Sequence, residues 1–172
     1  MAITTYNARV ELAKFIISKI NSTYLVIGRP TPWSNEQAPP EPTESTTKLD
    51  DIIGYKKVTK AVLVRPTKDS DTNREVISYG NKSWTVIGEG EAIAEGAKWV
   101  YFESQVVGDE LPTGTHRQAG IAIDVEPQTG IGKQALLPNE LNSQGTLMFY
   151  DNKQFQNRTE QVTTTERMVV EF

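Results

Sequence analysis

The chain has 172 residues, 37% hydrophobic and 23% charged, a composition typical of a globular protein with a sizeable core. It contains no cysteine, which excludes disulfide scaffolds, zinc ribbons and thiol chemistry, and no segment approaches the roughly 20 apolar residues that cross a bilayer. A formal net charge of −4 argues against a nucleic-acid-binding protein, and no secretory signal is visible at the start, so we expect neither nucleic acid nor membrane as a partner.

A helix is predicted near the start, over about residues 8–20. Glu11 lies early and Lys19 late in this segment, which is the order that the helix dipole favours. Asn7 is the predicted N-cap, and Asn21 and Ser22 end the helix. The apolar residues that recur at helical spacing are Val10, Ala13, Ile16, Ile17 and Ile20.

The most distinctive segment is a strand that runs into a proline-rich arm. Residues 24–27 are aromatic, aliphatic or β-branched and predict a strand that ends at Gly28. Five prolines follow by residue 42, and Trp33 lies among them. Because proline fixes φ and removes a backbone donor, we expect an extended, stiff arm over about residues 28–43, which loses little entropy on docking. Two roles are open for Trp33, packing back onto its own domain and anchoring a partner. The two roles do not exclude each other.

Downstream of the arm the sequence predicts one short helical turn, over residues 49–54, and then only strands. Gly80-Asn-Lys indicates a hairpin turn, whereas residues 126–143 are expected to form a long connection. Short strands separated by Gly, Pro and Asn predict a mainly β protein: one antiparallel β-sandwich domain over residues 1–172, with an N-terminal helix. The predicted strands are residues 58–64, 75–79, 83–87, 98–107, 119–125, 146–150 and 166–172.

No group of residues in the sequence predicts a catalytic, cofactor-binding or metal site. Asp50 and Asp51 are adjacent, so on a helical turn their side chains diverge, and we interpret them as a solvated pair. His116 is the only histidine and is expected in a loop beside Arg117. Residues 88–96 are glycine-rich but lack the lysine and serine or threonine of a phosphate loop, so they are expected to be a turn or loop.

Two parts of the chain resemble a known family. The stretch Ile27-Gly-Arg-Pro-Thr-Pro-Trp-Ser-Asn-Glu, followed by Ala38-Pro-Pro-Glu-Pro, is similar to a motif of the baseplate wedge subunit called gene product eight in contractile-tailed bacteriophages. Residues 145–152, Gly-Thr-Leu-Met-Phe-Tyr-Asp-Asn, and residues 116–123, His-Arg-Gln-Ala-Gly-Ile-Ala-Ile, resemble strands near the end of that family. Longer family members carry insertions that are absent here, so the resemblance is to a short, core-only version.

The resemblance implies a structural virion protein of the tail baseplate that is not an enzyme, needs no cofactor and is made in the host cytoplasm. It implies assembly with other baseplate wedge and tail proteins around the tail hub, and pairing with a second copy of itself. The residues that match the motif, and that we expect to form an interface or docking element, are Arg29, Pro30, Pro32, Trp33, Asn35, Pro39 and Pro40.

An alternative interpretation is a carbohydrate- or receptor-binding β-sandwich at the tail tip. Trp84, Trp99 and Tyr101 would stack on sugars if one sheet face exposed them. An enzyme has the least support, because no catalytic arrangement is visible.

Overall fold

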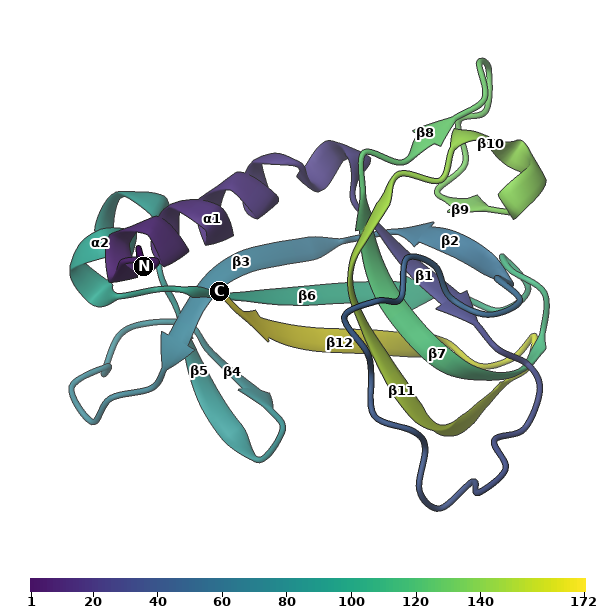
Figure 1. The fold of residues 1–172 in the computed structure, drawn as a ribbon, viewed down its shortest axis with the longest axis horizontal. Helices are drawn as coiled ribbons and strands as arrows, with labels where there is room; N and C mark the ends of the chain where they lie inside the picture. The colour runs from purple at the N-terminus through teal and green to yellow at the C-terminus, as the bar shows by residue number, and fades with distance from the viewer. The chain divides into compact units, whose positions relative to one another are not determined.

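The structure, a computed structural model, describes residues 1–172 and is mainly β, as predicted (Figure 1). Its strands form two five-stranded sheets and one two-stranded sheet, and the predicted antiparallel, sandwich-like architecture with an N-terminal helix is confirmed. The chain divides into two compact units, and the boundary between them falls inside two of the strands. None of its helices is long and apolar enough to span a membrane.

Unit 1 comprises residues 1–20, 59–103 and 167–172 and contains the sheet with the strand order β12-β6-β3-β5-β4. Its core gathers Val64, Trp84 and Tyr101, and α1 lies against β3. The elements are α1 (Tyr6–Ser18), β3 (Lys60–Pro66), β4 (Val76–Tyr79), β5 (Lys82–Val86), a 3₁₀ turn η2 (Glu89–Glu91), α2 (Ala92–Glu95), and parts of β6 (Trp99–Val106) and β12 (Thr164–Glu171).

The predicted helix exists but begins two residues earlier than expected. Its N-cap is Thr5, whose hydroxyl oxygen accepts a hydrogen bond from the Ala8 amide at 3.2 Å, in place of Asn7. The hairpin β4–β5 turns at Gly80 and Asn81, both with positive φ, as the Gly-Asn pair predicts. Residues 88–96, which were expected to be a turn or loop, contain η2 and α2, and Gly96 ends α2 in the left-handed conformation.

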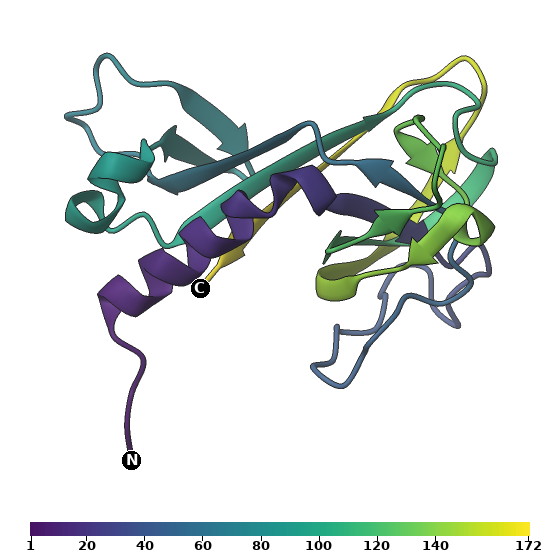
Figure 2. The same cartoon turned by 90° about the horizontal axis from the view of Figure 1, so that it is seen from above.

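Unit 2 comprises residues 21–58 and 104–166 and contains the sheet with the order β11-β7-β1-β2-β9. Figure 1 shows β7 and β11 curving together, and Figure 2 gives the view from above. Both faces of this sheet are covered: one packs Tyr24 and Val26 against Leu49, and the other packs Leu25 and Ile27 against Leu111. The elements are η1 (Ile20–Ser22), β1 (Tyr24–Gly28), β2 (Gly54–Lys57), β7 (Gly114–Ile123), β8 (Glu126–Pro127), β9 (Ala135–Leu136), η3 (Pro138–Glu140), β10 (Leu141–Ser143) and β11 (Thr146–Arg158).

Two predictions in unit 2 are wrong. Residues 49–53 form no helical turn: Leu49 is drawn into the core, Asp51 has a positive φ of 40°, and Gly54 already begins β2. The connection over residues 126–143 is not irregular throughout, because β8 and β10 pair within it and β9 joins the main sheet.

Candidate docking surface

The arm, residues 28–43, follows β1 and crosses the sheet beside β11 (Figure 1). Three contacts fasten it to three residues near the middle of β11. The Trp33 indole N–H donates to the Lys153 carbonyl at 2.8 Å, and the Asn152 side-chain amide donates to the Pro40 carbonyl at 2.9 Å. At the end of the arm the Thr43 amide donates to the Tyr150 hydroxyl at 2.6 Å. The arm is therefore attached along its length.

Arg29 fixes the position of Trp33. Its backbone is left-handed, with a φ of 55°, and its amide donates to the Asp50 carbonyl at 2.7 Å. The guanidinium carbon lies 3.9 Å from the centre of the Trp33 ring, and Nη1 pairs with the Asp50 carboxylate at 2.7 Å. With only 9% of its surface exposed, Trp33 packs on its own unit. Of the two expected roles of Trp33, the isolated chain thus shows packing onto its own domain.

The beginning of the arm is held by β7. The Pro30 carbonyl accepts hydrogen bonds from Arg117 Nη1 at 2.5 Å and from the Thr115 hydroxyl at 3.2 Å. Arg117 also donates through Nε to Glu36 at 2.8 Å, and this hydrogen bond holds the pKa of Glu36 below its usual value. The charged groups of Arg117 and Glu36 are thus paired within the unit.

The motif residues do not share one environment. Trp33 is buried, Arg29 and Pro39 are partly buried, and the others are exposed. The Asn35 carboxamide oxygen accepts the Gln37 amide at 3.0 Å and so shapes the arm locally. The residues on its exposed face are Pro30, Pro32, Asn35 and Pro40.

Phe155 belongs to the same surface and was missed in the sequence. The register between β11 and β7 shifts between Asn152 and Gln156, and Phe155 lies in this irregular stretch with 55% of its surface exposed. The Arg117 guanidinium, which also holds the arm, lies 5.6 Å from its ring centre. The available signal was a lone aromatic residue within the polar run of residues 151–158.

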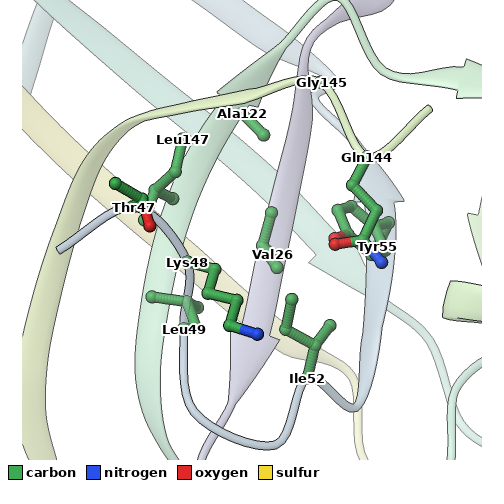
Figure 3. A pocket seen from close by; sticks show the side chains of 10 residues that line it. All are labelled: Val26, Thr47, Lys48, Leu49, Ile52, Tyr55, Ala122, Gln144, Gly145 and Leu147. Carbon is green, nitrogen blue, oxygen red and sulfur yellow. The ribbon is translucent and has the colours of Figure 1, made fainter.

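A small pocket lies at the base of the loop that follows the arm (Figure 3). In that view Val26, Leu49 and Ile52 form its apolar wall, and Lys48 and Gln144 stand at its mouth. Its volume is about 40 Å³, well below the roughly 300–1,000 Å³ of sites for small molecules. The pocket therefore has room for no more than one small chemical group.

The aromatic residues considered for sugar stacking lie in the interior of unit 1. Trp84 is 7% exposed and Tyr101 is 1% exposed, and both belong to the core. Trp99 is partly buried, with its ring centre 5.9 Å from that of Trp84. These three rings do not form an exposed platform.

His116 is not in a loop, as the sequence suggested, but in β7, where it is 1% exposed. Its Nε2 lies 3.0 Å from Glu166, which also pairs with Lys153. Burial opposes ionisation of Glu166, but the contacts with His116 and Lys153 lower its pKa below the usual value. No group of three or more His, Cys, Asp or Glu residues is placed to hold a metal ion. The arrangement is thus a buried polar cluster beneath the stretch of β11 that holds the arm.

Comparison with known proteins agrees with the resemblance noted in the sequence. The family model described as "Baseplate wedge 3 tail fiber network component" matches residues 1–172. Virion protein 3 of Enterococcus phage phiEF24C is 44% identical over 171 residues, which cover 99% of this chain and 94% of that protein. The prediction of a phage baseplate wedge protein with a structural role in the virion is confirmed. The chain belongs to the family of baseplate wedge 3 tail fiber network components.

Proposed function

We propose that this chain joins the baseplate wedge through the arm, by docking its exposed face on neighbouring wedge and tail proteins around the tail hub. It acts through protein–protein contacts, without a chemical step or a cofactor, and is made in the host cytoplasm before assembly. A second copy of the chain is among its partners.

The observation that carries this proposal is the way the arm is fastened. Its inner side is fixed by Trp33, Asn152 and Tyr150, while Pro30, Pro32 and Pro40 remain exposed. A partner that binds this surface does not have to order a flexible loop, which otherwise costs binding free energy. The exposed Phe155 beside the arm supplies an aromatic side chain of the kind that anchors protein interfaces.

The experiment places a bulky charge on the exposed face without touching the fastening contacts. Ala38 is exposed, and only its backbone amide is hydrogen bonded, to the Asn35 carbonyl. Ala38→Arg, supplied from a plasmid to a phage whose own gene is disrupted, should fold normally but enter particles about tenfold less than the wild type, a loss typical of a blocked interface.

The control is Thr129→Arg, on the exposed turn that follows β8. Figure 1 places this turn at the far end of unit 2 from the arm. The control should enter particles like the wild type. Equal incorporation of Ala38→Arg and Thr129→Arg would contradict docking through the arm.

A further inference from the structure

The sheet of unit 1 ends in a strand with one open edge. β12 is the last strand in the order β12-β6-β3-β5-β4, so it pairs with β6 on one side and with no strand on the other. Its residues 167–171 belong to unit 1 and include Met168, Val169 and Val170, all partly buried, and no proline that would keep the edge from pairing. The unpaired backbone groups of this edge suit one kind of occupant, another extended strand.

The apolar core on the concave face of this sheet is incompletely covered at β12. Tyr79 in β4 and Tyr101 in β6 lie three strand positions apart, which is about 14 Å in a flat sheet. Their ring centres are only 6.5 Å apart, so the sheet curls around its core. Val169 packs against this core from β12 and stays partly exposed. A strand added beside β12 would cover it.

Residues 1–5, here called the N-terminal segment, have the properties of such a strand. Residues 1–4 make no hydrogen bond and are exposed, Ile3 to 87%. Ile3 and Thr4 are β-branched, which favours a strand, and Thr5 has an extended backbone with a φ of −76° and a ψ of 163°. Five extended residues span about 16 Å, which matches residues 167–171 of β12 in length.

The N-terminal segment starts beside the end of β12. Arg9 Nη1 donates to the Phe172 carbonyl at 2.8 Å. The Tyr6 ring centre lies 5.1 Å from Nζ of Lys98, whose carbonyl accepts the Phe172 amide at 3.0 Å. To lie along its own β12 the segment would have to reverse at Thr5, the N-cap of α1, but Figure 2 shows it leading away from the start of the helix. In a two-fold pair, each segment can instead extend toward the partner, and the same contact forms twice.

We propose that two copies of this chain exchange their N-terminal segments, so that residues 1–5 of each copy add a strand to the open edge of β12 in the other. This inference rests on the proposed pairing with a second copy and names the residues that make the contact. It does not depend on the role proposed for the arm.

The side chains of β12 indicate the register of the added strand. On the concave face Val169 lies between Arg167 and Glu171, because alternate residues of a strand share a face. A register that places Ile3 beside Val169 joins the apolar residue of the segment to the apolar residue of that face. The residues next to Ile3 then point to the opposite face, as Val170 does.

Disulfide trapping tests the contact, and the chain offers no cysteine of its own to confuse it. The full chain with Ile3→Cys and Val169→Cys is supplied from a plasmid to the gene-disrupted phage, and purified particles are oxidised. Opposite side chains on one face of paired strands are within reach of a disulfide. We expect a product with the mass of two chains, in which peptide mass spectrometry finds position 3 linked to position 169.

The matched control is Ile3→Cys with Val170→Cys. Val170 is partly buried like Val169 but points to the opposite face of the strand, so this pair should give no linked peptide. The proposal is overturned if the Val169 pair gives no linked peptide, if both pairs link equally, or if the link lies within one chain.

A second readout separates strand exchange from pairing as such. An amine-reactive crosslinker applied to wild-type particles should give a two-chain product, which Ile3→Asp should lose and Ile93→Asp, at another exposed isoleucine of unit 1, should keep. If Ile3→Asp keeps the product, the copies pair by another surface and the inference fails while the proposed pairing stands. If the wild type gives no product, the pairing fails and the inference fails with it. Ala38→Arg tests the arm separately.

Discussion

At the scale of single residues, Trp33 is the buried aromatic side chain of the arm. Its ring lies between the Arg29 guanidinium and β11, and its indole N–H reaches a backbone carbonyl. From the sequence, a proline-flanked tryptophan could be expected to be important, but the residues that hold Trp33 and the rest of the arm could not be identified. Lys153 and Arg117 lie 120 and 84 positions away from Trp33 along the chain. Such contacts depend on the register between β7 and β11, which the local sequence pattern does not fix.

Trp33→Ala should lower the free energy of unfolding by about 3 kcal/mol, because truncating a buried tryptophan leaves an unfilled space. Trp33→Phe keeps most of the ring and loses the hydrogen bond, so its cost should be smaller, about 1 kcal/mol. Urea denaturation measures both values. If Trp33→Ala is as stable as the wild type, the tryptophan does not hold the arm in solution.

A second prediction at this scale concerns Asp71. Arg65, 4% exposed, holds Asp71 through two hydrogen bonds of 2.7 and 2.8 Å and also contacts Glu95 at 2.8 Å. The hydrogen bond from Arg65 is the main reason that the pKa of Asp71 lies well below its ordinary value of 3.8. A carboxylate whose pKa is depressed by folding stabilises the native state above its unfolded pKa. That contribution is lost as the pH falls through the folded pKa.

The urea midpoint of the wild type should therefore fall as the pH is lowered below about 4, and Asp71→Asn should reduce this dependence. Asp69→Asn, an exposed carboxylate in the same loop, is the control and should leave the dependence unchanged. Identical pH profiles for the wild type and Asp71→Asn would contradict a role for this ion cluster in stability.

At the scale of elements, hydrophobic periodicity was a good guide where strands or helices bury a face. It predicted α1, β1, β3 and the β4–β5 hairpin close to their observed bounds. It missed β2, because Gly-Tyr-Lys-Lys has no alternation, and it ended β11 at residue 150 although the strand runs to Arg158. Residues 151–157 are polar or exposed and are held in the sheet by backbone hydrogen bonds to β7, which leave no hydrophobic pattern in the sequence. The turn expected at residues 49–54 failed because Leu49 packs into the core as part of a loop.

The close approach of β7 and β11 depends on Gly120. A Cβ there would lie 2.7 Å from the Phe149 carbonyl oxygen and 2.8 Å from a Leu147 methyl carbon. Gly120→Ala should therefore cost about 1–3 kcal/mol of stability, because strand backbone has to move. Gly132→Ala, where a Cβ would meet nothing within 4 Å, is the matched control and should cost little. Equal unfolding midpoints for the two variants would show that the strands yield more easily than the structure indicates.

At the scale of the whole molecule, the two units are each assembled from separate stretches of chain. Unit 1 draws on three segments and unit 2 on two, so neither is a continuous piece of sequence. We propose that residues 1–172 nevertheless behave as one folding domain. Differential scanning calorimetry should show a single transition with equal calorimetric and van't Hoff enthalpies. Two resolved transitions would show that the units fold independently.

The chain belongs to a family of baseplate wedge components of a tail fiber network, and the exposed face of the arm is the surface through which we propose that it binds its neighbours. The sequence showed the arm through its prolines. In α1 the apolar residues all look like core in the sequence, and only the structure separates buried Val10 from exposed Phe15.

Electron cryomicroscopy of the intact baseplate, at a resolution that shows side chains, tests the central claim most directly. The account predicts that the arm lies on β11 with the Trp33 indole at the Lys153 carbonyl, and that a neighbouring subunit covers Pro30, Pro32 and Pro40. An arm detached from β11, or an arm whose prolines face only solvent in the assembled wedge, would contradict it.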